Sequence, residues 1–299
     1  MKNIISYAGG YGKSVINVGG VTYSNFLLQN VVENWGPQLK IDSGYEDWWV
    51  KLIGTKPKLR KLTGIIPAEY VDEFIENYKS IWRISQCLKS SNKVKINYKD
   101  RQLSGYITGL RIIDRSNVIP SFEMDYVAVT ETIIQPVQTD NTYEKLIFDR
   151  SLDTGEDENK ATIIYKREDE GDTTYDDFIL LSVVKQFNEK YSLIDLSGDN
   201  FNMISYGSAP DVFNFNIALS ENNENSLADA TEFLKNVKQY WQLSVDNKEL
   251  IKICYRDRMA GGIMTDISSV SARGDMASMS FGLIANNDIN IPISTGTVT

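Results

Sequence analysis

An internal repeat constrains the fold of this chain more than any other feature of its sequence. Apolar residues with spacings of three and four recur in two segments, at residues 74–82 and 233–241. Such spacings place the apolar side chains on one face of an α-helix. The matching residues are Phe74, Ile75, Tyr78, Ile81 and Trp82 in the first segment and Phe233, Leu234, Val237, Tyr240 and Trp241 in the second. The same amphipathic helix is therefore predicted twice.

The segments on either side of the two helices also repeat, and they do so in the same order. The most distinctive match is a Tyr-basic-Asp-Arg motif that follows each helix and suggests the tip of a tight hairpin. Chance similarity between two helices does not explain a shared order of flanking segments, so the sequence predicts a tandem duplication of one unit. The matched segments are residues 54–66 with 207–219, residues 96–105 with 253–262, and residues 121–128 with 278–285.

Each unit is predicted to consist mainly of antiparallel strands with one helix on one face. Two extended runs, at residues 49–53 and 59–65, are joined by a turn; a helix then begins at Pro67 and runs to about Cys87. A hairpin and a long final strand follow. The predicted fold class is α+β, mostly antiparallel β, with two tandem domains that each carry one flanking helix. A turn-rich segment at residues 135–140 separates a first domain, residues 1–136, from a second, residues 137–299.

The composition excludes several classes of function. The chain of 299 residues contains no histidine, which removes histidine-based triads and most catalytic zinc sites. Its formal net charge of -9 disfavours tight binding to nucleic acid. The two cysteines, Cys87 and Cys254, are too few for a metal cage and suggest small buried side chains in a reducing compartment. No segment is apolar enough for a membrane helix or a signal peptide, so no membrane partner is expected.

Two short motifs resemble ligand sites but lack required features. The run from Gly9 to Ser14 is similar to a phosphate-binding loop, yet Tyr7 stands where that loop has its first glycine, and a strand-like segment follows in place of a helix. The acidic run from Asp153 to Glu158 lacks the alternating pattern and central glycine of a calcium loop. A glycine turn and a solvated acidic loop are the preferred interpretations, and no cofactor, metal or catalytic residue is predicted.

The repeated hairpin tips are the candidate site. A charged tip is often only exposed to solvent, but its occurrence in both units makes a contact between subunits equally plausible. The candidate subunit-contact residues are Lys99, Asp100 and Arg101 in the first unit and Arg256, Asp257 and Arg258 in the second.

The order of strand pair, helix, Tyr-basic-Asp-Arg hairpin and long final strand resembles the tail-tube fold of bacteriophages and related contractile injection systems. The resemblance is one of architecture and covers residues 39–132 and 192–287. It implies two tube-like β-barrel or sandwich domains. It also implies a virion structural protein, made in the host cytoplasm and located in the virion tail.

In that family, a chain with two tube domains forms a homotrimer with a pseudo-hexameric ring, so the resemblance implies the same here. The implied partners are further copies of the chain, stacked rings, and other tail or baseplate proteins. DNA or a tape-measure protein would pass through the lumen without specific binding, which agrees with a negative charge.

Two other classes of function are weighed against this one. A β-sandwich module that binds carbohydrate or another ligand could use Trp48 and Trp49, since aromatic rings stack on sugars. A hydrolase that works with carboxylates alone would need two of them at a defined separation, and no such pair stands out. The sequence therefore predicts a protein that assembles and is not an enzyme.

Overall fold

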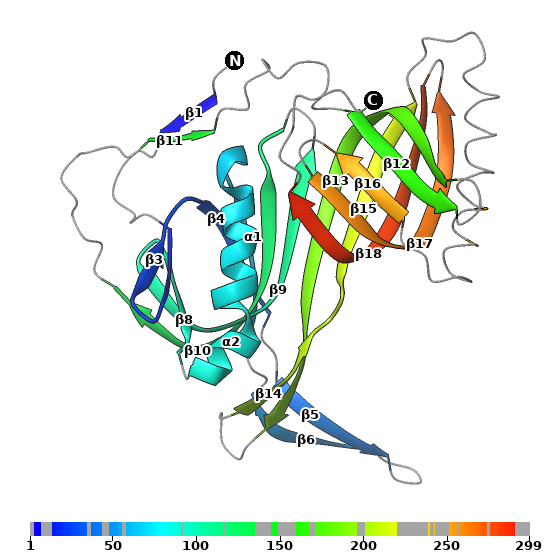
Figure 1. Ribbon diagram of the computed structural model, residues 1–299. Helices are drawn as coiled ribbons and strands as arrows, with labels where there is room; N and C mark the ends of the chain where they lie inside the picture. Colours follow the sequence, from blue (N-terminus) through cyan, green and yellow to red (C-terminus); the bar gives the residue numbers. More distant parts are fainter. Residues whose placement is uncertain are drawn as a thin grey trace. The chain divides into compact units, whose positions relative to one another are not determined.

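The computed structural model is mostly antiparallel β-structure with short helices, which agrees with the predicted class (Figure 1). The chain forms two compact units. Unit 1 consists of Met1–Ile112, Ile119–Arg150 and Phe187–Ala209, and unit 2 of Ile113–Val118, Ser151–Gln186 and Pro210–Thr299. The described residues are 3–6, 14–34, 37–43, 48–55, 58–90, 92–115, 118–134, 145–148, 160–167, 171–195, 201–219, 239, 242, 251–255, 258–273 and 276–290.

In unit 1, seven strands follow one another in the order β3-β2-β8-β9-β10-β7-β4. Two smaller pairings belong to the same unit: β5 with β6, and β1 with β11. The bounds are β1 Asn3–Ser6, β2 Val15–Val18, β3 Val21–Tyr23, β4 Leu27–Asn34, β5 Pro37–Ser43, β6 Trp48–Thr55, β7 Lys58–Ile65, β8 Val94–Tyr98, β9 Arg101–Arg115, β10 Ser121–Ile133 and β11 Lys145–Phe148. The predicted turn at Gly54–Pro57 does not make a hairpin of β6 and β7, because β6 pairs with β5 and β7 pairs with β4 and β10.

The predicted first helix is present but interrupted. It begins after Pro67 with a 3-10 turn, Ala68–Tyr70, and continues as α1, Val71–Asn77, and a π-helical turn, Tyr78–Trp82. Arg83 then adopts an extended backbone, and α2 resumes at Ile84–Ser90. The helix therefore does not run unbroken to Cys87; the break turns Arg83 toward Glu189, whose carboxylate lies 2.5 Å from its guanidinium.

An aromatic cluster fills the space between this helix and the strands of unit 1. Phe74 and Trp82 of the helical segment are in edge-to-face contact at 5.0 Å between ring centroids, and both rings contact Tyr23. Phe26 and Phe122 complete the cluster from the strand side. Burial of each such ring stabilises the fold by roughly 1.5–3 kcal/mol. The predicted apolar face of the helix is thus the face that packs on the sheet.

In unit 2, six strands follow one another along the sheet. The order is β12-β16-β17-β18-β15-β13, and β13 also pairs with β12. β13 spans Gly171–Asp195, and only its residues up to Gln186 belong to unit 2. The buried side chains of unit 2 include Phe215 and Phe281, whose rings stack at 5.4 Å between centroids. The remaining bounds are β12 Lys160–Arg167, β14 Phe201–Ser208, β15 Asp211–Leu219, β16 Ile251–Tyr255, β17 Arg258–Arg273 and β18 Met276–Asn290.

The strand pairing of unit 1 recurs in unit 2 at the shifts that the sequence repeat predicts. β15 and β18 correspond to β7 and β10, and β16 and β17 correspond to β8 and β9. The first part of β13 corresponds to β3 and β4 together, and both β4 and β13 carry a bulge at the same place, at Gln29 and Leu181. The matching cross-strand pairs include Lys58–Ala128 with Asp211–Ala285, Tyr98–Arg101 with Tyr255–Arg258, and Glu33–Arg60 with Lys185–Phe213.

A pair of glycines shows how closely the two units agree. A Cβ atom on Gly105 would lie 2.0 Å from the carbonyl oxygen of Val127, and one on Gly262 would lie 2.1 Å from that of Ile284. Both distances are far below van der Waals contact, so both strands require glycine for this close backbone approach.

Some predictions fall outside the described residues. The second predicted helix is one of them, although Gln239 and Gln242 within it are helical and exposed. The predicted boundary segment at residues 135–140 also lies outside them. The predicted division at residue 136 places Phe187–Ala209 in the second domain, whereas in the structure these residues belong to unit 1. Among the described residues, every helix is too short or too polar to serve as a membrane span.

Candidate subunit-contact site

The first candidate tip is a two-residue turn between β8 and β9. Tyr98 pairs with Arg101, and Lys99 and Asp100 form the turn itself. Lys99 has a φ of 54°, in the left-handed region. A positive φ at the first central residue alone is typical of a type II′ turn, which favours glycine at that position. The tip therefore holds a lysine in a conformation that costs free energy.

Carboxylates hold Arg101 in place at this tip. Its guanidinium donates a hydrogen bond of 2.7 Å to Glu131 and lies 3.9 Å from the carboxylate of Asp100. The hydrogen bond to Glu131 and the negative charge of that group raise the pKa of Arg101. The side chain is 52% exposed, so it remains accessible from solvent while one carboxylate orients it.

Arg60 of β7 is the residue of this site that the sequence did not single out. Its side chain is only 1% exposed and contacts two carboxylates, Glu131 at 2.5 Å and Glu33 at 3.1 Å. Burial alone would raise the pKa of Glu131, but hydrogen bonds from Arg60 and Arg101 lower it below its ordinary value. One signal was available: Arg60 stands two residues before the buried Leu62, on the inward face of an alternating strand.

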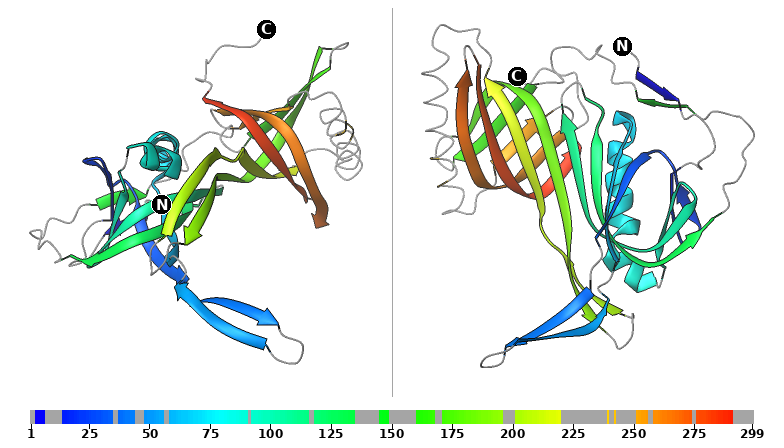
Figure 2. Two further views of the ribbon diagram at one scale, coloured as in Figure 1. Left: turned by 90° about the horizontal axis from the view of Figure 1, so that it is seen from below. Right: turned by 180° about the vertical axis from the view of Figure 1, so that it is seen from behind.

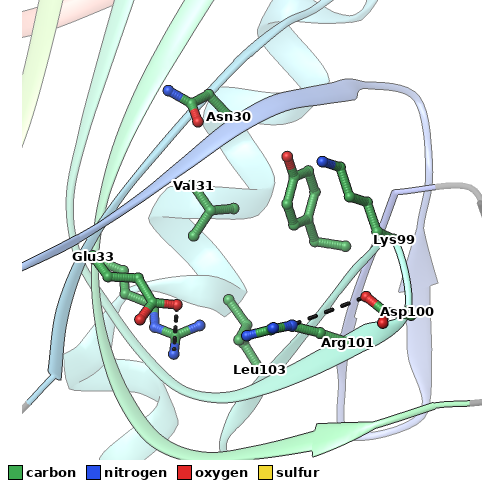
Figure 3. A pocket seen from close by; sticks show the side chains of 9 residues that line it. Asn30, Val31, Glu33, Lys99, Asp100, Arg101 and Leu103 are labelled. Atoms are coloured by element: carbon green, nitrogen blue, oxygen red, sulfur yellow. Dashed lines mark ion pairs between the residues drawn. The ribbon is translucent and has the colours of Figure 1, made fainter.

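These side chains border a pocket of about 360 Å³ beside the tip (Figure 3). Lys99 extends along one side, with its ammonium 5.0 Å from the centre of the Tyr98 ring, and Arg101 lies beside Asp100. Both guanidinium groups of the pocket already contact carboxylates, which offsets their positive charge. The lining residues are Asn30, Val31, Glu33, Arg60, Tyr98, Lys99, Asp100, Arg101 and Leu103.

The second candidate tip is only partly described. Arg256 and Asp257 lie outside the described residues, whereas Arg258 is half-buried and pairs with Tyr255 as Arg101 pairs with Tyr98. Near this pair the buried Lys185 lies 5.5 Å from the centre of the Tyr255 ring. The structure therefore gives the two tips the same backbone pairing, and the role of both in subunit contact stays a prediction.

The sequence motifs that resemble ligand sites are only partly described by the structure. Ser14 is buried, accepts a hydrogen bond of 3.2 Å from the backbone N–H of Leu28 and precedes strand β2, which is not the setting of a phosphate-binding loop. The acidic run at residues 153–158 lies outside the described residues. Trp48 and Trp49 begin β6, but their side chains lie outside the description, so a carbohydrate site there stays an untested alternative.

The cysteines and acidic residues offer no other site in the described part of the chain. Both cysteines carry thiols; Cys87 is buried, which raises its pKa to about 12, and Cys254 is half-buried. Within the described ranges, no group of three or more cysteine or acidic side chains is arranged to hold a metal ion. The described site is thus a charged hairpin tip at which carboxylates hold the guanidinium groups of Arg60 and Arg101, while the ammonium of Lys99 lies over the Tyr98 ring.

No model of a known protein family matches the chain, and no curated protein is significantly similar to it. The function has to be inferred from the sequence and geometry of the chain itself.

Proposed function

We propose that this chain is a virion structural protein that forms a ring of a phage tail tube or of the tube next to the baseplate. Each unit would be one tube-like β-barrel domain, and the chain would contain two of them by internal duplication. Three copies would then give a pseudo-hexameric ring with six such domains. Stacked rings and neighbouring tail or baseplate proteins would be its partners, and the virion tail its location.

One observation carries this proposal: the two units have the same strand pairing, down to a shared bulge and a shared close approach at Gly105 and Gly262. Two equivalent bodies in one chain suit a ring in which every position presents the same contacts. In unit 2, β12 pairs with both β16 and the first part of β13, an arrangement that would suit a barrel. The repeat thus supports a pseudo-symmetric assembly more directly than it supports a single binding site.

The charge of the chain agrees with a conduit. A formal net charge of -9 over 299 residues would repel phosphate groups, so DNA passing through a lumen would not adhere to its wall. The charged tip at Lys99–Arg101 would then be one of the contacts between domains. A contact between charged groups at the edge of an interface would determine the relative orientation of two domains more than the strength of their binding.

Native mass spectrometry and electron microscopy of the purified protein test the proposal. We expect a species of three times the 33.8 kDa chain mass, and class averages with a central channel and three-fold or pseudo-six-fold symmetry. A protein that stays monomeric at every concentration would refute the proposal. Binding to a glycan array by such a monomer would favour the carbohydrate-binding alternative.

A further inference from the structure

The helical segment of unit 1, cyan in Figures 1 and 2, breaks at a point that its own sequence does not mark. Residues 68–90 contain neither proline nor glycine, the residues that most often interrupt a helix. Nevertheless, Tyr78–Trp82 forms a π-helical turn, and Arg83 has an extended backbone with a φ of -63° and a ψ of 147°. The cause of the break therefore lies outside the segment.

The second repeat has a helical residue at the position of the break. In the alignment of the two helices, Gln239 corresponds to Ser80 and Gln242 corresponds to Arg83. Both glutamines are helical. Arginine and glutamine have similar helix propensities, so the residue type does not explain why Arg83 is extended. A helical backbone at Arg83 is therefore compatible with the repeated pattern.

The break gives two backbone carbonyl groups a weak hydrogen-bond donor. In an α-helix, the carbonyl oxygens of Ile81 and Trp82 would accept hydrogen bonds from backbone N–H groups four residues later. Here the buried thiol of Cys87 donates to both oxygens, at 3.5 Å. The N–H group of Gln86 bonds to the carbonyl oxygen of Arg83 instead. Because a thiol is a weaker donor than an amide, the broken helix has a cost that other contacts must offset.

The β13–β14 hairpin, which consists of residues 187–195 of β13 together with β14, contacts the broken residue directly. The Nε atom of Arg83 donates a hydrogen bond of 2.6 Å to Glu189, whose side chain is fully buried. Arg83 also forms an isolated parallel bridge with Ile107 of β9. A single bridge is a small contact, so we expect the buried ion pair to be the stronger reason for the extended backbone.

The residue after the break carries the apolar part of the same contact. Ile84 of α2 is fully buried in one cluster with Met203 of β14 and Val127 of β10. Figure 1 shows β14 close to α2. Because Arg83 and Ile84 are adjacent, the ion pair and the apolar contact depend on the same change of backbone direction. Further members of the cluster are Leu88, Tyr106, Tyr191, Leu193 and Phe201.

The hairpin also contacts the π-helical turn, but its docking is incomplete. The ring of Phe187 lies 6.0 Å from that of Tyr78, whose hydroxyl donates to the Phe187 carbonyl oxygen at 3.5 Å. In contrast, the Oε2 atom of Glu189 is buried and has no hydrogen-bond partner among the described residues. A buried acceptor without a donor costs free energy. The docked hairpin thus carries a cost of its own, which makes its release easier.

We infer that the helical segment and the β13–β14 hairpin form one two-state element. With the hairpin docked, the helix is broken at Arg83; with the hairpin released, residues 71–90 form one continuous α-helix. The states exclude each other, because Arg83 cannot be extended and helical at once. A molecule that binds the inner face of the hairpin would therefore join the two helices, and one that binds the continuous helix would release the hairpin. This inference goes beyond the proposed function and does not depend on a ring.

A pair of introduced histidines that binds Ni²⁺ across the break tests the inference. The chain has no histidine, so in protein purified without a histidine tag the pair is the only imidazole site. Histidines four residues apart share a helix face and bind one metal ion together when the segment is helical. Ile81→His with Ser85→His spans the break, and Ser85→His with Lys89→His lies within α2 as the matched control. Adding Met203→Asp, which puts a charge into the docked cluster, should tighten Ni²⁺ binding by the spanning pair about ten-fold or more and leave the control pair unchanged.

The reverse effect needs no substitution in the hairpin and decides the matter even if Met203→Asp fails to fold. Because coupling is reciprocal, Ni²⁺ bound to the spanning pair should speed hydrogen exchange of the β14 amides, whereas Ni²⁺ on the control pair should not. If Ni²⁺ binds the spanning pair and exchange in β14 stays the same, helix and hairpin are independent and the inference is wrong. If the spanning pair never binds more tightly than one histidine while the control pair does, the continuous helix does not form, and the inference is wrong as well.

Discussion

The two units share their backbone pairing but differ in the chemistry of one cross-strand pair. In unit 1, Glu33 stands opposite Arg60; at the same register in unit 2, Lys185 stands opposite Phe213. Arg60 is held by carboxylates, whereas the ammonium of Lys185 lies 5.4 Å from the centre of the Phe213 ring. A buried cation is kept in both units with a different kind of neighbour. The comparison teaches that the repeated unit is defined by which strands pair, and not by the residue types at this cross-strand position.

The largest expected effect concerns the close backbone approach at glycine that both units share. Gly105→Ala and Gly262→Ala should each destabilise the protein by about 3 kcal/mol or more, because the new Cβ atom would overlap a carbonyl oxygen of the neighbouring strand. Gly261→Ala is the matched control, since no atom lies within 4 Å of its added Cβ. Urea unfolding measures the losses. Similar losses for Gly262→Ala and Gly261→Ala would show that the close approach does not constrain this strand.

A second prediction concerns the ion pair between Arg83 and Glu189 at the base of the β13–β14 hairpin. Arg83→Ala should cost about 3 kcal/mol, because it leaves the Glu189 carboxylate buried without its cation. Gln242 is the counterpart of Arg83 in the second helix and is exposed, so Gln242→Ala should change stability by less than about 0.5 kcal/mol. Hydrogen exchange should locate the loss in β14. Unchanged protection of β14 in Arg83→Ala would contradict the anchoring role of the pair.

A third prediction concerns Arg60 of unit 1, which is replaced by the residue type that stands at the corresponding position of unit 2, Phe213. Arg60→Phe should destabilise unit 1 by about 2 kcal/mol at neutral pH, because Glu131 loses a buried partner. The pKa of Glu131 is lowered in the folded protein, so its contribution is present above its ordinary value of 4.5 and is lost as the pH falls through the lowered pKa. Unfolding curves at pH 7 and pH 3 should therefore show a smaller difference between variant and wild type at the lower pH. An unchanged difference would mean that Glu131 is not the group responsible.

The smallest expected effect lies in unit 2. Lys185→Met keeps the length of the side chain and removes its charge from between two aromatic rings, so we expect a loss of about 1 kcal/mol. Urea unfolding of the variant and the wild type at pH 7 measures this loss. Equal stability of the two proteins would show that the ammonium does not stabilise unit 2 through the two rings.

Much of the fold was predictable because it follows from local patterns. The apolar periodicity at Phe74–Trp82 predicts the helix face that packs on the sheet, and the turn residues before Arg101 predict the β8–β9 hairpin. The break at Arg83 was not predictable, because at this residue the chain contacts Glu189 and forms a β-bridge with Ile107, and both partners are distant in sequence. Arg60 was missed for a similar reason: its two carboxylates come from separate strands.

By itself, the sequence determined that one β-rich unit occurs twice, and it predicts a helix and a charged hairpin in each, since these features depend on spacing and turn chemistry. Only the tertiary structure decided which strands pair and where each hairpin packs. The reason is that β-pairing joins segments distant in sequence, and neither propensity nor periodicity specifies which edge a strand will find. The transfer of Phe187–Ala209 from the second repeat to unit 1 illustrates the difference: alternation marks it as a hairpin with an apolar face, and packing alone assigns that face to α2, β9 and β10.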